Sequence, residues 1–373
     1  MKTSRSSDLP TFLEFFAGSG LVAEGMKTYF LPAWANDICE KKASVYHANI
    51  GKKHFKPGSI ADFKGKDLPC ANLAWASFPC QDLSLAGNMD GLDGKRSGLV
   101  WQWLRILDEM PKKPQILVAE NVEGLVSSDG GAHYKALHKA LSNRGYKTGA
   151  VLLDAVKWVP QSRPRIFVIS VPNSFDTSKY STDKPTWAHS ASIEKAAKGL
   201  KNWVWWNLPE PAVRKLSLVD IIEEDEPHDD EKATKRNLQM LSPKHQAKLI
   251  QELANGFKVA PGYKRTRNGK QMLELRFDNV AGCLRTPEGG SSRQLLVIKK
   301  NGQLVTRLLT IRETARLMGV RDTYKFTGTY NDGYKAMGDA VAVPVVRHLA
   351  KHLLKPLEQA MRQLLLNLEP TRG

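Results

Sequence analysis

The sequence predicts an α/β protein, with a doubly wound, mainly parallel sheet and a second, smaller domain. Over the first 172 residues, short apolar runs alternate with segments of helical periodicity, which is the pattern of β–α–β units. After Pro172 this alternation stops, and prolines recur at irregular spacing until about residue 306. A chain of 373 residues with 42% hydrophobic and 25% charged residues is long enough for two folded domains.

Periodicity and stop signals place the elements of the first part. Residues 99–110 form an expected helix because Trp101, Leu104 and Leu107 share one face. The sequence Asn143-Arg144-Gly145 marks the end of another helix. The expected strands are 11–16, 32–36, 73–78, 115–122, 150–156 and 166–171, and the expected helices are 21–29, 99–110 and 133–141.

Helices return in the last part of the chain. Thr310 and Glu313 have the spacing of a capping box, which predicts a helix over 310–318. A shorter helix is expected at 245–253, and residues 344–366 predict one long helix or a pair. These features divide the chain into a first domain (1–172), a middle domain (173–306) and a return segment (307–373).

The balance of charge favours a polyanionic partner. The chain has 55 Lys and Arg against 38 Asp and Glu, which gives a net charge of +17 and an isoelectric point near 9.6. A basic surface without a particular partner is the alternative. The acidic run at 223–231 is interpreted as a solvated loop and not as a metal site.

Cysteine usage and hydropathy indicate the compartment. Cys39, Cys70, Cys80 and Cys283 show neither zinc-ligand spacing nor a disulfide framework, so at most one is expected to have a special role. The first residues lack the apolar region of a secretory signal, and no stretch approaches the roughly 18 apolar residues of a membrane span. We therefore expect a cytosolic protein with no membrane partner.

Cys80 is the candidate nucleophile. It follows Pro79 and the strand expected at 73–78, so it lies at the carboxyl end of a strand, where open α/β sheets bind ligands. The loop after it contains Gly87 and Gly91 and could close over a ligand. An ordinary flexible loop and a buried structural thiol are the alternatives.

The stretch Phe16-Ala17-Gly18-Ser19-Gly20 lies between the first expected strand and helix. Glycines there let backbone N–H groups approach a ligand at a helix N-terminus, although a tight turn gives the same pattern. Asp37 ends the next strand, where an acid binds ribose hydroxyls. Because Ala23 stands in place of a third glycine, a nucleoside cofactor without a pyrophosphate fits better than NAD.

Polar groups also mark two later strands. Glu120 and Asn121 end an apolar run, and a carboxyl group there is costly unless it has a partner. Glu120 either caps the next segment or hydrogen-bonds a heteroaromatic substrate, with burial favouring its protonated form. Arg163 and Arg165 precede the next strand and point the same way on an extended chain. They are either surface charges or hold a phosphate or a base.

Taken together and in this order, the motifs resemble those of the DNA cytosine-5 methyltransferase family. The matching stretches are Phe16 to Gly20, Pro79-Cys80-Gln81, Arg96 to Leu99, Glu120-Asn121-Val122, Gln161 to Arg165, Arg307 to Gly319 and Gly338 to Pro344. The last two resemble the family's ninth and tenth motifs, and the resemblance covers about residues 11–350 without the middle domain.

The resemblance implies a fold and a cofactor. The fold is that of S-adenosylmethionine-dependent methyltransferases, with residues 1–172 as the catalytic and cofactor-binding domain and residues 173–306 as the target-recognition domain. Residues 307–373 would supply a hinge helix and a C-terminal helix that completes the catalytic domain. The cofactor would be S-adenosyl-L-methionine, the product S-adenosyl-L-homocysteine, and no metal is expected.

The resemblance also implies where the cofactor binds. Phe16 would lie near the adenine, Asp37 would hold the ribose and Ile38 would stack on the adenine. Two sites depart from the family pattern, at Ser59-Ile60 and at Gly338-Asp339-Ala340, where different polar contacts are expected. The expected cofactor residues are Phe16, Ala17, Gly18, Ser19, Gly20, Asp37, Ile38, Ser59, Ile60, Pro79, Asp339, Ala340 and Val341.

The chemistry implied is methyl transfer to C5 of a cytosine flipped out of duplex DNA at a specific sequence. The Cys80 thiolate, favoured by the charge of Arg163 or Arg165, would add to C6. Protonated Glu120 would hydrogen-bond the ring nitrogen N3 and stabilise the adduct, while Pro79 and Asn121 shape the site. The expected DNA contacts are Gln81, Ser84, Arg96, Arg293 and Arg312.

The implied partners are duplex DNA and, in a restriction–modification system, a cognate restriction endonuclease. A monomer in the bacterial cytoplasm, associated with the nucleoid, is expected. The basic, Gly-rich segments of the middle domain would contact phosphates and base edges, and Trp203–Trp206 is interpreted as local core.

Three alternatives remain open. A tRNA cytosine-5 methyltransferase could use the same motifs, but the long middle domain disfavours it. A catalytically inactive DNA-binding relative is disfavoured because the nucleophile and the glycine loop are both kept. A nicotinamide-dependent oxidoreductase would explain Gly18 and Gly20, yet it gives Cys80 and Glu120 no joint task.

Overall fold

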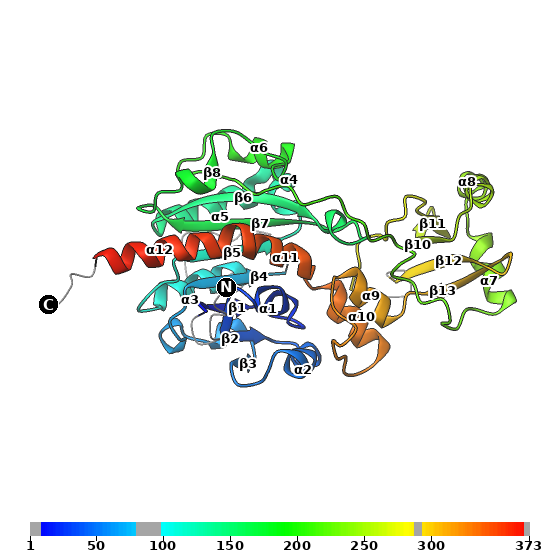
Figure 1. The fold of residues 1–373 in the computed structure, drawn as a ribbon, viewed down its shortest axis with the longest axis horizontal. Coiled ribbons are helices and arrows are strands. Elements are labelled where there is room, and N and C mark those ends of the chain that lie inside the picture. The colour runs from blue at the N-terminus through cyan, green and yellow to red at the C-terminus, as the bar shows by residue number, and fades with distance from the viewer. Residues whose placement is uncertain (1–8, 80–97, 287–292, 369–373) are drawn as a thin grey trace, which may run out of the picture. The chain divides into compact units, whose positions relative to one another are not determined.

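The structure is a computed structural model that describes residues 9–79, 98–286 and 293–368 (Figure 1). The chain forms two compact units, each described separately below. The first unit comprises Met1–Leu153, Pro164–Glu210 and Val345–Gly373, and the second comprises Asp154–Arg163 and Pro211–Pro344. Residues 173–210 therefore cluster with the first unit, and residues 307–344 cluster with the second.

The first unit is built on a seven-stranded sheet with the order β3-β2-β1-β4-β5-β7-β6. Strands β1 to β5 pair in parallel, and β7 runs antiparallel to β5. The predicted doubly wound, mainly parallel sheet is therefore confirmed. The strands are β1 (Thr11–Phe15), β2 (Leu31–Asp37), β3 (Phe55–Pro57), β4 (Leu73–Ser77), β5 (Ile116–Asn121), β6 (Tyr146–Asp154) and β7 (Pro164–Pro172).

Both faces of this sheet are buried, as expected for strands that read as continuous apolar runs. Leu13 and Leu117 pack in one core cluster with residues of α3 and α5. Phe12 and Val118, which alternate with them, are equally buried. The helices of this unit are α1 (Leu21–Met26), α2 (Glu40–Asn49), α3 (Leu99–Glu109), α4 (Gly124–Ser127), α5 (Ala132–Asn143), α6 (Ala191–Ala197), α11 (Val343–Leu349) and α12 (Lys355–Leu368).

The amphipathic pattern of α3 is confirmed with one difference. The buried stripe runs through Val100, Trp103, Leu104 and Leu107, whereas Trp101 is only partly buried. The last helix is continuous because a π-helical turn at Ala350–Leu354 joins α11 to α12. Figure 1 shows α12 as a long helix near the C-terminus.

The tryptophan-rich segment at 203–206 explains why residues 173–210 belong to the first unit. The two-residue strand β9 (Trp205–Trp206) pairs with β8 (Ser181–Thr182), and the Trp206 indole N–H donates to the Ile169 carbonyl of β7 at 3.1 Å. The Trp206 side chain is fully buried. The interpretation of this cluster as local core is confirmed.

The second unit contains a four-stranded antiparallel sheet with the order β11-β10-β12-β13. Its two hairpins turn at Asn268-Gly269 and Asn301-Gly302, where all four residues have positive φ, the geometry of a type I′ turn. The sheet packs through Ala260, Leu273 and Val297. The strands are β10 (Val259–Arg267), β11 (Lys270–Leu275), β12 (Gln294–Lys300) and β13 (Gln303–Leu308).

The helices of the second unit are α7 (Glu231–Gln239), α8 (Pro243–Ala254), α9 (Ile311–Leu317) and α10 (Tyr330–Gly338). The predicted capping box is present, since the Thr310 side chain accepts from the Glu313 N–H and the Glu313 side chain accepts from the Thr310 N–H. The Arg307 guanidinium lies 2.6 Å from the buried Glu313 carboxylate. Across the described ranges, no helix is both long enough and apolar enough to cross a membrane.

Candidate functional site

One edge of the first unit's sheet brings several strand ends together. Phe15 of β1 is in register with Asn36 of β2 and Ala76 of β4, and Ser77 of β4 is in register with Glu120 of β5. The carboxyl ends of these strands are therefore neighbours, and the antiparallel β7 begins at the same edge. Ligands bind at this edge in open α/β sheets.

The loop after β1 has a backbone that few side chains tolerate. Phe16 has φ 59°, a left-handed conformation that costs a bulky residue about 1–3 kcal/mol. The Ala17 N–H donates to the Asn36 carbonyl at 2.8 Å, which holds the loop against the end of β2. Gly20 has φ 88°, and a Cβ there would lie 2.9 Å from both Tyr46 and Ile50. The sequence therefore uses glycine at position 20 for steric reasons as well as conformational ones.

Asp37 fastens this loop to β2. One carboxylate oxygen, Oδ2, accepts from the Gly18 N–H at 2.8 Å, and Oδ1 accepts from the Cys39 N–H at 2.8 Å. Directly after Asp37, the Ile38 side chain is 71% exposed, which is unusual for an aliphatic residue beside a buried strand end. A buried acid beside an exposed apolar side chain and a tight backbone loop fits an adenosine group, with its polar ribose and flat apolar base.

Ser59 and Ile60 follow a residue, Gly58, that is hydrogen-bonded to the end of β2. The Gly58 N–H donates to the Asp37 carbonyl at 3.1 Å, and the Ser59 hydroxyl accepts from the Ala61 N–H at 3.3 Å. Ile60 itself is 2% exposed and packs in the core. In the protein alone, Ser59 therefore caps a short helical turn, Ile60–Asp62, and Ile60 anchors that turn.

Glu120 and Arg165 form an ion pair at the same edge. Arg165 Nε lies 3.3 Å from Glu120 Oε1, and both side chains are mostly buried. Arg165, the second residue of β7, is therefore the partner that a buried carboxyl group at position 120 requires.

Asn121 connects β5 to the segment that leads to Cys80. Its Nδ2 donates to the Phe78 carbonyl at 2.9 Å, and its Oδ1 accepts from the Val122 N–H at 2.8 Å. Pro79 is exposed directly after this segment. Cys80, Gln81, Ser84 and Arg96 lie outside the described residues.

Arg163 belongs to the second unit, and its guanidinium is occupied there. Nη1 donates to the Leu284 carbonyl at 3.0 Å, and Nη2 donates to the carbonyls of Gly338 at 2.7 Å and Ala340 at 2.6 Å. The side chain is 1% exposed. These contacts make Arg163 a residue that fixes the backbone of 338–340, and they separate it from Arg165, which pairs with Glu120 in the first unit.

The other predicted residues of the second unit also have partners within it. The Thr286 hydroxyl donates to the Asp339 carboxylate, and Val341 is buried. The Arg293 guanidinium lies over the Tyr330 ring at 5.7 Å. Arg312 Nη2 donates to the Tyr324 carbonyl at 3.1 Å, and the guanidinium lies over the Phe326 ring.

Glu14 is a buried acid that belongs to none of the motifs at the strand ends. It lies within β1 with no exposed surface, and the Tyr46 hydroxyl donates to its Oε2 at 3.3 Å. Burial raises the pKa of Glu14 to about 8, although the Tyr46 hydrogen bond acts in the opposite direction. The detectable signal was a carboxyl group inside the otherwise apolar run Thr11–Phe16, which is costly unless it is neutral or paired.

The acidic run at 223–231 serves local structure. Asp230 accepts from the Ala233 N–H at 2.7 Å at the start of α7, and Asp229 accepts from the Thr306 hydroxyl at 2.6 Å. In the part of the chain that the structure describes, no group of three His, Cys, Asp or Glu side chains could hold a metal ion.

Comparison with known proteins identifies the class. The family model for C-5 cytosine-specific DNA methylases matches residues 10–355, so the chain belongs to that family. The protein is therefore a DNA (cytosine-5-)methyltransferase by class, and family members use S-adenosylmethionine.

Two relatives are type II methyltransferases of similar length. The chain is 27% identical over 352 residues to M.Bsp6I of Bacillus sp. (strain RFL6), a match that covers 92% of this chain and 98% of that protein. It is 26% identical over 347 residues to M.HhaI of Haemophilus parahaemolyticus, covering 92% and 93%. Both relatives are named as type II methyltransferases.

Solved structures show the same fold. The Dnmt2 methyltransferase of S. pombe superposes with a TM-score of 0.62 at 19% identity, covering 94% of this chain and 99% of that one. A putative DNA modification methyltransferase encoded within an E. coli prophage gives a TM-score of 0.55 at 16% identity, covering 95% and 99%.

Proposed function

We propose that this protein methylates C5 of a cytosine flipped out of duplex DNA at a specific sequence, through a covalent bond between Cys80 and C6. The observation that supports it most is the group at the sheet edge. Glu120 is paired with Arg165, and Asn121 holds the backbone two residues before Cys80. The Phe16–Gly20 loop and Asp37 lie at the same edge.

The cofactor site would be formed by the Phe16–Gly20 loop, Asp37 and Ile38. Asp37 would accept from the ribose hydroxyls, and the exposed Ile38 side chain would cover one face of the adenine. When bound, S-adenosylmethionine supplies the electrophilic methyl group and leaves as S-adenosylhomocysteine. The segment Asp339–Val341 and the residues Ser59, Ile60 and Pro79 are further proposed contacts, and we propose no metal.

The chain's own residues would carry the covalent chemistry. The Cys80 thiolate adds to C6, and the electron pair of the C5–C6 double bond moves to C5, which becomes nucleophilic. Protonated Glu120 donates a hydrogen bond to N3 and stabilises the adduct, and Arg165 holds the Glu120 side chain in place. After C5 is methylated, a base removes the C5 proton, the double bond re-forms and the thiolate leaves.

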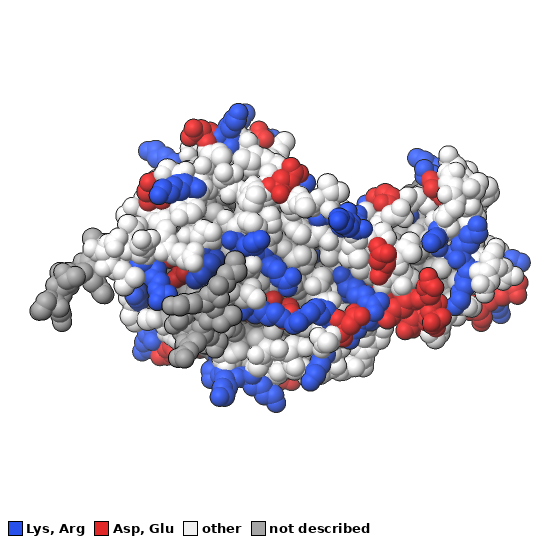
Figure 2. Space-filling view, viewed as in Figure 1, with Lys and Arg blue, Asp and Glu red and all other residues white. Residues whose placement is uncertain are grey.

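Two features support duplex DNA as the substrate, namely the positive charge of the chain and the presence of the second unit. On the face drawn in Figure 2, Lys and Arg side chains recur across the first unit. With a net charge of +17, the protein suits a polyphosphate partner. We propose that the middle domain predicted at 173–306, of which residues 211–306 lie in the second unit, recognises the target. The proposed DNA contacts are Gln81, Ser84, Arg96, Arg293 and Arg312.

We further propose that the protein acts as a monomer in the bacterial cytoplasm, at the nucleoid. Its proposed partner within the same system is a cognate restriction endonuclease.

Labelled S-adenosylmethionine with either duplex DNA or tRNA tests this function. We expect label in DNA alone, and in 5-methylcytosine after digestion. Transfer confined to tRNA would refute the DNA substrate and support the alternative enzyme.

Covalent trapping tests the nucleophile. Duplex DNA with 5-fluorocytosine at the target position keeps a fluorine on C5 that the base cannot remove, so the adduct should persist. We expect a denaturant-resistant complex with the parent protein and with Cys70→Ala, whose thiol is exposed and outside the proposed site. Cys80→Ala should form none, and a Cys80→Ala protein that still methylates would rule out the mechanism.

A further inference from the structure

The β10–β11 hairpin of the second unit presents one charged face. In β10, Tyr263, Arg265 and Arg267 alternate with residues of the opposite face, and Tyr263 is in register with Glu274 of β11. Leu273 and Leu275 of β11 point to the other side and pack in the hydrophobic core. The hairpin is therefore held by its apolar face and by the buried Tyr263, while Arg265, Arg267 and Glu274 keep part of their side chains in solvent.

Glu274 connects the two arginines of this face. Arg265 Nε lies 3.1 Å from one Glu274 oxygen, and Arg267 Nε lies 2.8 Å from the other. The hydrogen bond from Arg267, together with the charges of Arg267 and Arg265, holds the pKa of Glu274 below its usual range. Within the described chain both ion pairs are made through Nε, so the terminal nitrogens of Arg267, whose side chain is 62% exposed, remain for a ligand.

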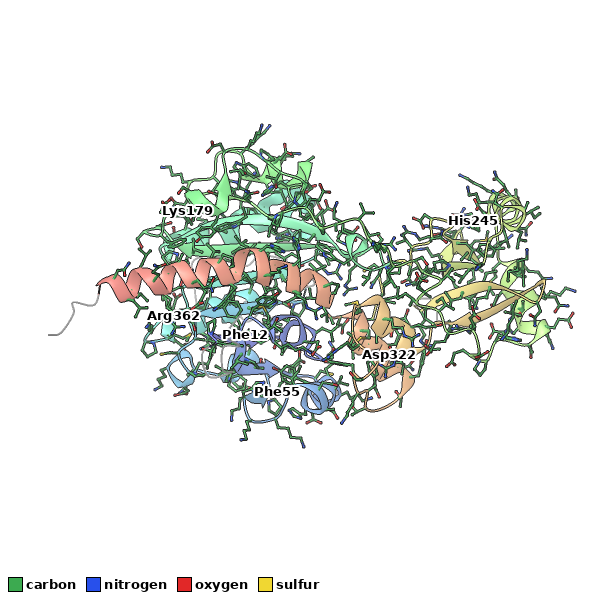
Figure 3. The ribbon with its side chains drawn as sticks, in the orientation of Figure 1. Phe12, Phe55, Lys179, His245, Asp322 and Arg362 are labelled. Carbon is green, nitrogen blue, oxygen red and sulfur yellow. The ribbon has the colours of Figure 1, made fainter. Side chains whose placement is uncertain are left out.

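A concave site of about 590 Å³ lies against this face. Its lining contains five Lys or Arg side chains and a single carboxylate, that of Glu274. The guanidinium groups of Arg265 and Arg285 lie over the Tyr263 ring at 5.6 and 5.7 Å, which fixes them beside the site. His245 of α8, labelled in Figure 3, also lines it, and its Nδ1 accepts from the Leu275 N–H. A built, positively charged hollow of this kind suits an anionic ligand with polar edges.

The shape of the hairpin indicates which part of DNA it fits. A two-stranded β-ribbon enters the major groove of B-DNA, where guanine presents two acceptors, O6 and N7. The tight Asn268-Gly269 turn keeps the tip narrow, and the residues at the turn, Arg267 and Lys270, are paired across it and exposed. Arginine is the side chain that donates two hydrogen bonds to guanine in one plane.

We propose that the β10–β11 hairpin reads a G·C base pair of the recognition sequence in the major groove, with Arg267 donating to guanine and Glu274 positioning the Arg267 guanidinium. This inference rests on the proposed action on duplex DNA and adds which element and which side chains discriminate the sequence. Tyr263 holds the guanidinium groups of Arg265 and Arg285 against the hairpin, where they would contact the phosphates next to the base pair.

Genome-wide mapping of 5-methylcytosine tests the proposal, in cells that make no other cytosine methylase and express the parent or a variant. The variants are Arg267→Ala, Arg267→Lys and Glu274→Gln, and the matched control is Lys248→Ala, another exposed cation paired with a glutamate in the same unit. For Arg267→Ala we expect methylation of sites that differ from the parent motif at one G·C position, with that discrimination reduced roughly 5- to 150-fold. Arg267→Lys should behave similarly, because lysine keeps the charge but not the paired donors. Glu274→Gln should relax the same position to a smaller extent.

The outcomes separate the inference from the function on which it depends. A parent protein that leaves no 5-methylcytosine overturns both. A parent motif that all three Arg267 and Glu274 variants keep unchanged overturns the inference alone. So does a uniform loss over all sequences in which Arg267→Lys retains parent activity, because that is the behaviour of a phosphate contact. Thermal unfolding of each purified variant shows whether the second unit remains folded, and Lys248→Ala should keep the parent motif.

Discussion

At the scale of single residues, the edge of the first sheet combines neutralised and paired acids. Asp37 accepts from two backbone N–H groups, Glu120 pairs with Arg165, and Glu14 is buried beside the Tyr46 hydroxyl. The free-energy cost of burying each carboxyl group is therefore offset by a different kind of neighbour. This division of roles follows from the neighbours that the fold supplies.

Glu14 predicts a specific dependence of stability on pH. Its folded-state pKa of about 8 lies above the ordinary value of 4.5, so the folded protein binds an extra proton between these pH values. Stability should therefore fall as pH rises through this window, by an amount on the order of a few kcal/mol. Glu14→Gln, which mimics the neutral acid, should match the parent near pH 5 and exceed its melting temperature near pH 8.5. Equal melting temperatures of the two proteins at both pH values would contradict the buried, neutral Glu14.

We expect substitution of Arg163 to lower the free energy of unfolding more than substitution of Arg165. Lysine at 163 has its donors on a single nitrogen and does not reproduce the two separate nitrogens, Nη1 and Nη2, that serve the carbonyls of Leu284, Gly338 and Ala340. At about 1–3 kcal/mol for each buried group left unsatisfied, Arg163→Lys should lower the free energy of unfolding by several kcal/mol. Arg165→Lys, which needs to keep only the single ion pair with Glu120, is the matched control and should cost less. Chemical denaturation measures both, and equal losses would argue against the anchoring role of Arg163.

At the scale of elements, the start of α9 is a capped junction. The Thr310 hydroxyl accepts from the Glu313 N–H at 3.1 Å and donates to Glu223 at 3.1 Å, while Glu313 binds Arg307 in the interior. The helix N-terminus, the end of β13 and the acidic run thus share one hydrogen-bond network. Such a network fixes where α9 begins.

Thr310→Ala should lower the free energy of unfolding by about 1 kcal/mol, the usual effect of removing an N-cap side chain. Thr310→Ser keeps the hydroxyl and should retain most of the stability. Denaturant titration followed by far-UV circular dichroism measures the two variants, and a serine variant as unstable as the alanine variant would show that the methyl group, not the cap, matters.

At the scale of the whole molecule, the excess of basic residues should control binding to DNA of any sequence. Each phosphate contact lowers affinity as salt rises, with a slope of about −0.9 per contact in a double-logarithmic plot. Even two contacts would weaken binding about tenfold between roughly 50 and 200 mM salt. Fluorescence anisotropy with a random duplex measures this, and affinity that is independent of salt would contradict a phosphate-based interaction by a chain of charge +17.

Much of the catalytic fold could be predicted because it depends on local patterns. Apolar runs bounded by turn residues marked β1, β2, β4, β5 and β7, and the Thr310–Glu313 spacing marked the start of α9. The ordered motifs at strand ends placed Asp37, Glu120 and Arg165 at one edge, since parallel strands present their carboxyl ends together. The sheet of the second unit was missed, although the Asn-Gly pairs at 268–269 and 301–302 are hairpin signals.

Local patterns along the chain were enough to indicate the parallel sheet, the order of the motifs and the charge that suits DNA, because each depends on spacing or composition. Long-range contacts decided the rest. Arg163 and Arg165 are two residues apart, yet one anchors Gly338 and Ala340 in the second unit and the other pairs with Glu120 in the first. The acid Glu274 likewise gains its place between two arginines only when β10 and β11 pair. Spacing along the chain does not specify which distant carbonyl or carboxylate a guanidinium will meet, because that choice is made by packing.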